Sequence, residues 1–434
     1  MDDSTTKIIE SIRKFDVAAI CSDLIKIPSY SGSEQQEKEI AFFIRDFFNE
    51  YKIDSELQEV FPGRPNVIAT LPGCHDLIAS STGHSQDDSV KQNNDNKSGQ
   101  TTDAASDPKS RSLLLNGHLD TVPKYDMKDP FSGRITGGRI YGRGACDMKG
   151  PIAAMMVAVV GIKTSGIKLT SDLYFAGLID EEVNEEGVRH LVKTGPFASA
   201  SITGEPTGMK IALGQKGLEW FRLIVHGKKV HSGSMEEGRN AVVMAARIIK
   251  RIEDEYAQEL RNKKDEILGY PTINIGRING GDQPSTVPDY CEVCFDRRFV
   301  RDDDVDDFYS EMESLVQDEA KKYPGFSFDI RPFAGGHENA RSCRLPFCTD
   351  KSSDIINSIN SAVDKLGFKP KELTTFPAWT DAGTIHRYTK SDCLIMGPGE
   401  ISLAHSANES IGIDELKEAA EIYAMTALEY CGTV

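Results

Sequence analysis

Short runs of apolar residues recur along the chain and predict buried strands. Runs of about four to eight apolar residues, bounded by glycine or polar positions, are typical of strands inside a sheet. They occupy residues 66–70, 112–115, 173–179, 200–203 and 393–396. Longer apolar or amphipathic stretches predict helices at residues 152–160, 350–366 and 414–430. Together they predict an α/β domain in which helices cover both faces of a mixed sheet.

A second set of elements predicts a smaller inserted α+β domain. Strand-like runs at residues 218–227, 291–298 and 326–331 alternate with helical segments at 238–256 and 304–323. The first helix is supported by apolar residues at helical spacing, namely Val242, Ala245, Ala246, Ile249 and Ile252. We therefore divide the chain into residues 1–212, an inserted domain at 213–332, and residues 333–434, which complete the first domain.

Residues 80–110 differ from the rest of the chain in composition. The segment is rich in Ser, Asp, Asn, Gln, Lys and Thr and has few apolar residues. Such a composition buries too little apolar surface to offset the entropy lost on ordering. We expect a disordered insert between two strands of the sheet.

The net charge limits which partners the protein can bind, and the cysteines indicate the cellular compartment. A net charge of −17 argues against binding to nucleic acid or to anionic membranes. The nine cysteines have no framework spacing, and the pair Cys291 and Cys294 lies inside a predicted strand. We interpret them as reduced packing residues. The N-terminus has no signal-like apolar segment, and we find no stretch long enough to span a membrane. The sequence therefore favours a cytoplasmic protein.

Acidic and histidine side chains follow the predicted strands. His118 and Asp120 come after the run at 112–115, and their spacing on an extended backbone points both side chains the same way. Asp120 is thus placed to orient the ring of His118 if the ring binds a metal. Asp147 lies between glycines, which permit a close approach, and its two oxygens could bridge two cations. A loop histidine beside an unrelated acid and a solvated turn aspartate are the alternatives.

Further acids and a second histidine occupy equivalent positions. Glu181 and Glu182 follow the run at 173–179, Glu205 follows 200–203, and His405 comes after 393–396. Side chains at the ends of several strands of an α/β sheet converge on one crevice. Each residue alone could equally belong to a solvated loop, but the full set in this order predicts a site for two metal ions.

The motif set resembles that of a metallopeptidase and deacylase family. This family contains acetylornithine deacetylase, succinyl-diaminopimelate desuccinylase, aminoacylase and carboxypeptidase G. The resemblance covers nearly the whole chain except the insert. It is carried by GHLDTVP at 117–123, GACDMKG at 144–150, DEE at 180–182, GEPT at 204–207 and AH at 404–405.

The resemblance implies a role for each of these residues. Asp147 would bridge two divalent ions, with His118 and Glu205 completing one site and Glu182 and His405 the other. Glu181 would be the general base, and Asp120 would support His118. Imidazole and carboxylate ligands suit zinc, and the oxygen ligands also admit cobalt or manganese.

The inserted domain carries further candidates implied by the resemblance. In the family it forms a homodimer and closes the cleft as a lid, and a histidine from it enters the partner's active site to stabilise the oxyanion. His231 matches that residue, with Asn240 in the following Gly-x-Asn-Ala motif, although Ser232 to Glu237 replace a segment that more often has proline. Arg298 matches an arginine that holds a substrate carboxylate, in preference to Arg297. Thr380 lies in a segment resembling a substrate loop. The alternatives are a structural loop residue for His231, surface charge for the two arginines, and a plain turn for the segment with Thr380.

Taken together, the sequence predicts a metal-dependent amidohydrolase that acts on a small molecule. The expected reaction is cleavage of the amide of an N-acyl amino acid, as in acetylornithine deacetylase. The first alternative is a dipeptidase or carboxypeptidase of the same family, acting on a short peptide. The alternative from another class is a non-catalytic binding protein that retains the fold, and the complete ligand set with its base argues against it.

Overall fold

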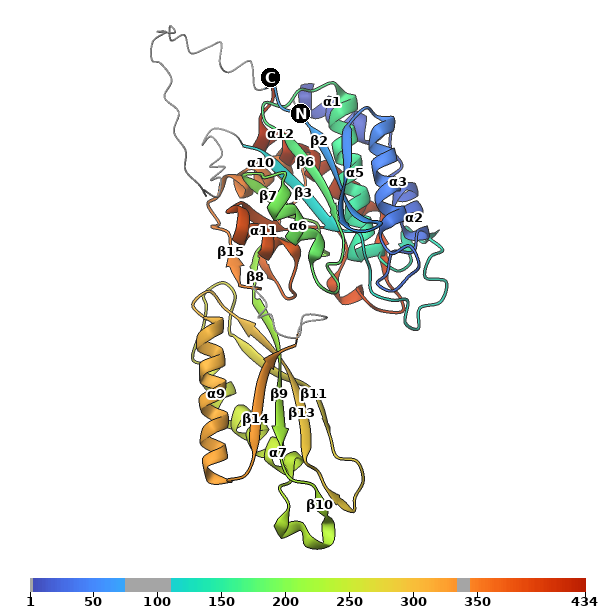
Figure 1. Cartoon of the computed structure of the whole chain (residues 1–434). Helices are drawn as coiled ribbons and strands as arrows, with labels where there is room; N and C mark the ends of the chain where they lie inside the picture. The colour runs from blue at the N-terminus through green and yellow to red at the C-terminus, as the bar shows by residue number, and fades with distance from the viewer. Residues whose placement is uncertain (1–2, 75–110, 334–343) are drawn as a thin grey trace, which may run out of the picture.

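The larger of two domains is built on a nine-stranded sheet (Figure 1). The structure is a computed structural model that describes residues 3–74, 111–333 and 344–434. The strand order is β1-β2-β6-β3-β7-β17-β8-β15, and β16 pairs with β8. Parallel pairs at the centre and antiparallel pairs at the edges make the sheet mixed, as the sequence predicts. The strands are β1 (Asp54–Phe61), β2 (Arg64–Leu71), β3 (Leu113–His118), β6 (Leu173–Leu178), β7 (Ala200–Thr203), β8 (Ile211–Gln215), β15 (Phe347–Cys348), β16 (Leu373–Phe376) and β17 (Asp392–Ile395).

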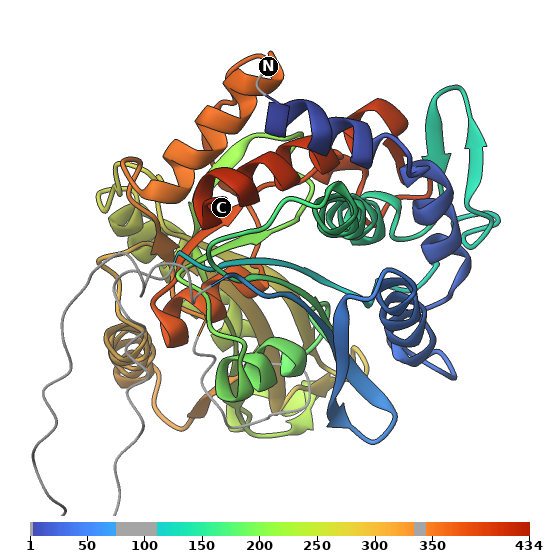
Figure 2. The same cartoon turned by 90° about the horizontal axis from the view of Figure 1, so that it is seen from above.

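Helices cover both faces of this sheet, as Figure 2 shows from above. The strands are apolar on both sides: Leu113 and Leu115 point into one core, whereas Leu114 points into the other. Over the first core lie α1 (Asp3–Ile12), α2 (Val17–Lys26), α3 (Lys38–Glu50), α5 (Gly150–Ser165), α10 (Asp354–Leu366) and α12 (Ile413–Cys431). Over the second lie α6 (Glu186–Thr194) and α11 (Asp381–Thr389).

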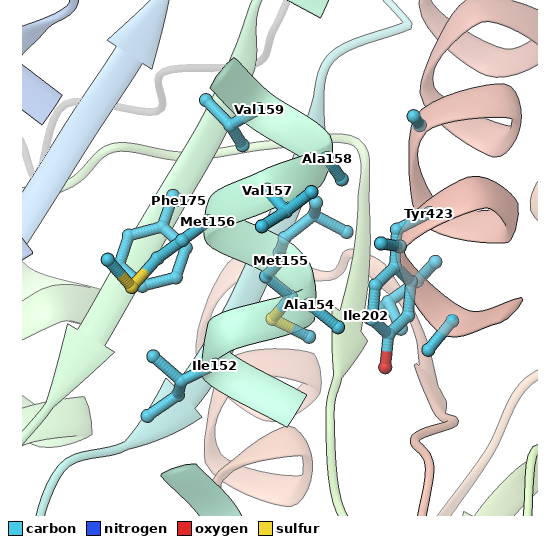
Figure 3. Close-up of a cluster of buried hydrophobic side chains, with 14 of the residues drawn as sticks. Ile152, Ala154, Met155, Met156, Val157, Ala158, Val159, Phe175, Ile202 and Tyr423 are labelled. Atoms are coloured by element: carbon cyan, nitrogen blue, oxygen red, sulfur yellow. The ribbon is translucent and has the colours of Figure 1, made fainter. Parts of the chain in front are cut away.

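Helix α5 is the centre of the larger core. Figure 3 shows its side chains between Phe175 of β6, Ile202 of β7 and Tyr423 of α12. The helical stretch Ala145–Ser165 is long and apolar enough to cross a membrane by length and composition, so the expectation that no stretch reaches that length is wrong. Its most apolar part is wholly buried inside this fold. A helix that is apolar all round is typical of the core of a large domain.

The second domain, which we call the lid, is a four-stranded antiparallel sheet with helices on one face. Its strand order is β11-β13-β9-β14, from β9 (Gly217–His226), β11 (Thr272–Gly280), β13 (Tyr290–Phe299) and β14 (Ser327–Pro332). Alternate residues of β9 and β13 pack against α7 (Ala241–Arg251) and α9 (Val305–Lys322). Shorter elements are β10 (Val230–His231), η2 (Ser232–Glu237), η3 (Ile252–Tyr256), α8 (Ala257–Leu260) and β12 (Thr286–Val287). This is the predicted α+β architecture. Strand β8 still belongs to the large sheet, so the chain enters the lid at Lys216.

A small three-stranded sheet, separate from the large one, packs against α2 and α12. It joins β4 (Arg134–Thr136) and β5 (Arg139–Tyr141) to β18 (Ser410–Gly412). This pairing brings the segment before β18, which includes η4 (Ile401–Leu403), close to η1 (Ala145–Lys149). The eight cysteines within the described ranges are free. The predicted disordered insert at 80–110 lies outside them.

Candidate metal centre

The predicted ligands gather at one edge of the large sheet. Strands β6, β3, β7 and β17 are parallel neighbours, so their carboxyl ends meet at the same edge. His118 is the last residue of β3, Glu182 follows β6 and Glu205 follows β7. His405 comes from the loop after β17. Four of the motifs thus become a spatial cluster because each follows a strand of the parallel set, and Asp147 joins them from η1, just before α5.

Asp147 lies between the two histidines and presents one oxygen to each. Its Oδ1 is 3.0 Å from Nε2 of His118, and its Oδ2 is 3.2 Å from Nε2 of His405. Oε1 of Glu205 is 3.9 Å from Nε2 of His118, and Oε1 of Glu182 is 3.2 Å from Nε2 of His405. This divides the residues into two groups that share one carboxylate, which is the arrangement needed to bridge two ions.

Asp120 supports the site in a different way from the one predicted. Nδ1 of His118 lies 2.9 Å from the backbone carbonyl oxygen of Asp120, whereas the nearest carboxylate oxygen of that residue is 3.7 Å away. The carbonyl therefore accepts the Nδ1 proton and leaves Nε2 free to bind a cation. The carboxylate of Asp120 accepts the backbone N–H groups of Glu181 and Glu182, at 3.1 and 3.0 Å. It holds the turn that carries these acids.

Buried acids dominate the electrostatics of the cluster. Burial raises the pKa of Glu181 and of Glu205 well above the ordinary range, and neighbouring carboxylates raise both further. Burial acts in the same direction on Asp147, but hydrogen bonds with His118 and His405 outweigh it and lower its pKa. Hydrogen bonds with Asp147 and Glu182 raise the pKa of His405 to about 10. Crowded carboxylates of this kind are stabilised by bound cations.

The donor set therefore fits divalent metal ions. Candidate ligand atoms of His118, Asp147 and Glu182 all lie within 4.8 Å of one another. Imidazole nitrogens with carboxylate oxygens form the usual ligand set of catalytic zinc and also admit other transition metals. Glu181 shares a turn with Glu182 but is not needed as a ligand, so its carboxylate can act on protons.

Comparison with known proteins identifies the family. The model of the peptidase family M20/M25/M40 matches residues 114–429. The chain belongs to this family. It is accordingly a metallohydrolase of the dinuclear M20 type, with the cluster around Asp147 as its candidate metal site.

Two curated relatives at low sequence identity are a deacetylase and a deformylase. Acetylornithine deacetylase of Myxococcus xanthus is 28% identical over 328 residues, covering 74% of this chain and 80% of the relative. N-formyl-4-amino-5-aminomethyl-2-methylpyrimidine deformylase of Halalkalibacterium halodurans is 24% identical over 440 residues, covering 96% and 95%. The solved structure of the dipeptidase Dug1p from Saccharomyces cerevisiae has a TM-score of 0.73 at 16% identity and covers 99% of both chains. The last similarity establishes the fold.

Two buried charges that the sequence analysis missed brace the M20 metal site. Arg143 and Glu409 form an ion pair with Nη1 and Oε2 2.6 Å apart, and each side chain is 1% exposed. Glu409 also accepts the backbone N–H groups of Cys146 and Asp147, at 3.1 and 3.2 Å. Arg143 donates to the carbonyl oxygens of Pro123, Lys124 and His405. One pair thus joins the loops that carry His118, Asp147 and His405.

The sequence holds only a weak signal for this pair. Arg143 stands between two glycines, and Gly144 has a φ of 83° where a Cβ atom would lie 2.8 Å from Cγ2 of Thr121. A charged residue within such a tightly packed turn indicates burial. Its partner, more than two hundred positions later, cannot be identified from one sequence.

The lid candidates differ in their surroundings. The side chain of Arg297 is only 1% exposed and pairs with Asp303, whereas Arg298 lies on the other side of β13. Arg298 binds both carboxylate oxygens of Asp296, at 2.7 and 3.0 Å, and its side chain is 24% exposed. Of the two arginines, only Arg298 is therefore open to a ligand, and its contact with a substrate carboxylate stays a prediction.

His231 and Asn240 are remote from the metal cluster of their own chain. Figure 1 places β10, which ends at His231, at the end of the lid furthest from the large sheet. The ring of His231 is exposed, and its Nδ1 accepts the N–H of Gly233 at 3.1 Å. Asn240 caps α7 by accepting the N–H of Val243 at 3.0 Å. Neither residue joins the site within one chain.

Thr380 does not meet the expectation of a substrate contact. Its side chain is fully buried, and its hydroxyl donates to Oε1 of Gln215 at 2.7 Å. The hydroxyl oxygen of Thr380 also accepts the N–H of Ala382 at the start of α11. The prediction is wrong for this side chain, because Thr380 caps a helix and anchors the end of β8.

Proposed function

We propose that this M20 enzyme hydrolyses the amide bond of an N-acyl amino acid, in the manner of an acetylornithine deacetylase. The placement of Asp147, with one oxygen toward each histidine and Glu181 beside the cluster, carries the proposal. The deacylase and deformylase relatives support an acyl group as the part removed. The intact set of acids and histidines argues against a protein that only binds.

The ligand roles follow the two groups around Asp147. His118 and Glu205 would complete one ion site, and Glu182 and His405 the other. When bound, two divalent ions lower the pKa of a water molecule and polarise the carbonyl of the amide. Zinc, cobalt and manganese all suit these donors.

Glu181 supplies the proton transfers. Its carboxylate would take a proton from the attacking water and pass it to the leaving nitrogen, so that the amine departs neutral. Burial raises the pKa of Glu181 above its ordinary range, and a carboxylate with a raised pKa is a stronger proton acceptor. Asp120 fixes the backbone of Glu181 and so sets the direction of its side chain.

The lid would complete the site from a second subunit. His231 is too remote to act in its own chain, so we propose a homodimer in which it reaches the partner's site and stabilises the oxyanion. Arg298 would bind the carboxylate of the amino acid. We also propose that the enzyme works in the cytoplasm.

A substrate screen tests the function. Purified protein is stripped of metal, reloaded with zinc, cobalt or manganese, and incubated with N-acetyl, N-formyl and N-succinyl amino acids and with dipeptides. Release of free amine should be metal-dependent, and Glu181→Gln, which keeps the shape of the side chain, serves as the matched inactive control. Faster cleavage of dipeptides than of every N-acyl amino acid would identify a dipeptidase instead. Absence of hydrolysis with all three metals would refute the proposal.

A further inference from the structure

The chain crosses between the two domains twice, and residues at the first crossing lie against Arg344, which follows the second. The first crossing joins β8 to β9 at Lys216, and the second lies between β14 and β15. The N–H of Leu218 donates to the carbonyl oxygen of Arg344 at 2.8 Å. A Cβ atom on Gly217 would lie 2.6 Å from the same oxygen, so only glycine permits this approach. The first residues of the lid are therefore tied to the backbone of Arg344, so a lid motion that displaces Leu218 acts on Arg344.

The side chain of Arg344 reaches the turn that carries the catalytic acids. Its Nε lies 2.8 Å from Oε1 of Glu185, with the two side chains 9% and 0% exposed. The N–H groups of Glu185 and Asn184 both donate to the carbonyl oxygen of Asp180, at 2.6 and 3.0 Å. These bonds close a turn over residues 180–185 that includes Glu181 and Glu182. On its other side, the guanidinium group of Arg344 lies 5.9 Å from the ring centre of Trp220 on β9.

Arg344 is the main counter-charge of Glu185. The second cation near Glu185 is Arg189, whose Nη2 lies 3.7 Å from Oε2 and whose side chain is 32% exposed. A buried carboxylate needs a close partner, because an uncompensated charge is expensive in a protein interior. The distant and solvated Arg189 is the weaker of the two. The position of Glu185 thus depends on where the hinge places Arg344.

The contacts among Glu185, Arg344 and Trp379 depend on how these side chains are oriented. Both carboxylate oxygens of Glu185, Nε of Arg344 and Nε1 of Trp379 are buried, and none has an aligned hydrogen bond within the described ranges. Buried polar groups are normally paired, and each exception calls for an explanation. Groups that are close together but not aligned can align after a small rotation of one element. The hinge supplies such a rotation, since lid closure is the common motion of two-domain hydrolases.

We propose that Arg344 is a positioning residue that links the orientation of the lid to the turn carrying Glu181 and Glu182. When the lid moves, Arg344 pulls or releases Glu185, and the turn shifts relative to His118 and Asp147. The roles of Glu181 and Glu182 in this link rest on the proposed function. The link itself rests only on the contacts between the hinge and the turn, which do not depend on the proposed function.

The test compares Arg344→Met with Arg189→Met, which removes the outer cation from the same carboxylate. Arg344→Met should lower kcat by roughly 10–100-fold and weaken zinc binding by a similar factor, because Glu182 is displaced. Arg189→Met should change either quantity by less than about fivefold, the effect of a solvated ion pair. Arg344→Lys should recover part of the loss. Zinc affinity is measured from the rise in unfolding temperature with added zinc, and kcat and KM with the best substrate of the screen.

The outcomes separate the possibilities. An Arg344→Met protein that is less stable but has unchanged kcat and zinc affinity would reduce Arg344 to a structural residue and overturn the proposal. Equal effects of both methionine variants would overturn it as well, since bulk charge would then be the cause. If Arg344→Met does not fold, Glu185→Gln gives the same comparison, and unchanged kcat and zinc affinity in that variant count against the link. If the wild type cleaves nothing, the proposed function fails while the zinc titration still tests the hinge.

Discussion

Replacing Glu409 by Gln should both destabilise the larger domain and weaken its metal site. The carboxylate accepts Nη1 of Arg143 at 2.6 Å and the backbone N–H groups of Cys146 and Asp147 at 3.1 and 3.2 Å. A glutamine has one acceptor oxygen, so its amide nitrogen must face a donor. Breaking a buried ion pair by removing one partner costs about 3–5 kcal/mol. We expect a loss of that size for Glu409→Gln, and a loss of roughly 10–100-fold in zinc affinity because Asp147 is no longer held.

Urea unfolding of the metal-free protein and zinc titration measure the two effects. The matched control is Glu429→Gln, which removes a partner of Lys365 from a pair whose side chains are 20% and 40% exposed. That change should cost less than about 1 kcal/mol and leave zinc binding as it is. The double variant Arg143→Met/Glu409→Gln should lose less than the sum of the single losses, because neither charge is then left alone. A Glu409→Gln protein within about 1 kcal/mol of the wild type, with unchanged zinc affinity, would refute the reasoning.

Other predictions concern the metal ions, the base, the subunits and pH. Asp147→Ala should lose bound metal as well as activity, which elemental analysis of protein saturated with zinc measures; retention of two tight ions would contradict the bridging role. Glu181→Gln should keep its metal and lower kcat by about 10²–10⁴-fold, and near-normal turnover would exclude it as the base. Mixing inactive His231→Ala and Glu181→Gln proteins should restore some activity through mixed dimers, whereas no recovery after proven subunit exchange would mean that His231 does not act in the partner. Arg301 and two backbone N–H groups outweigh the effect of burial and hold the pKa of Asp265 at about 2, so its stabilising contribution should be present above about pH 4 and fade toward pH 2. The difference in urea midpoint between wild type and Asp265→Asn should therefore shrink below pH 4, and a constant difference would contradict the assignment.

The sequence predicts the strands and helices that are apolar on both sides, but it misses some that are apolar on one face only. Strands β3, β6, β7 and β17 and helices α5 and α12 lie close to their predicted ranges, because burial from both sides leaves continuous apolar runs. Strand β11 has no such run, since most of its residues are exposed at the edge of the lid sheet. The amphipathic helix α3 was not predicted, and its buried face is set by packing on β1 and β2. Tertiary contacts decide such elements more than local preference.

Most metal ligands could be predicted because they follow strands, but their supporting residues could not. His118 ends β3 and Glu205 follows β7, and parallel pairing brings these strand ends together, with His405 in the loop after β17. Asp120 contacts the ring of His118 as predicted, but through its carbonyl rather than its carboxylate, because two-residue spacing predicts a shared side-chain direction only while the chain stays extended. After His118 the backbone turns, so the carbonyl of Asp120 faces the ring and its carboxylate faces the next turn. Thr380 likewise looks like a loop residue until Gln215 is seen to cover it.

The supporting charges explain how loops of a large enzyme hold a cluster of acids in place. Arg143 and Glu409 join the three loops that carry metal ligands, and Arg344 and Glu185 join the turn of Glu181 to the hinge. Both pairs are buried, and a buried pair is seldom the most stabilising choice for a core. What such a pair contributes is orientation, because each of its oxygens and N–H groups bonds to one backbone segment and holds that segment in place. One pair lies wholly within the larger domain and the other connects that domain to a hinge, so damage to the first should weaken metal binding in every lid position. Damage to the second should weaken the dependence of the site on lid position.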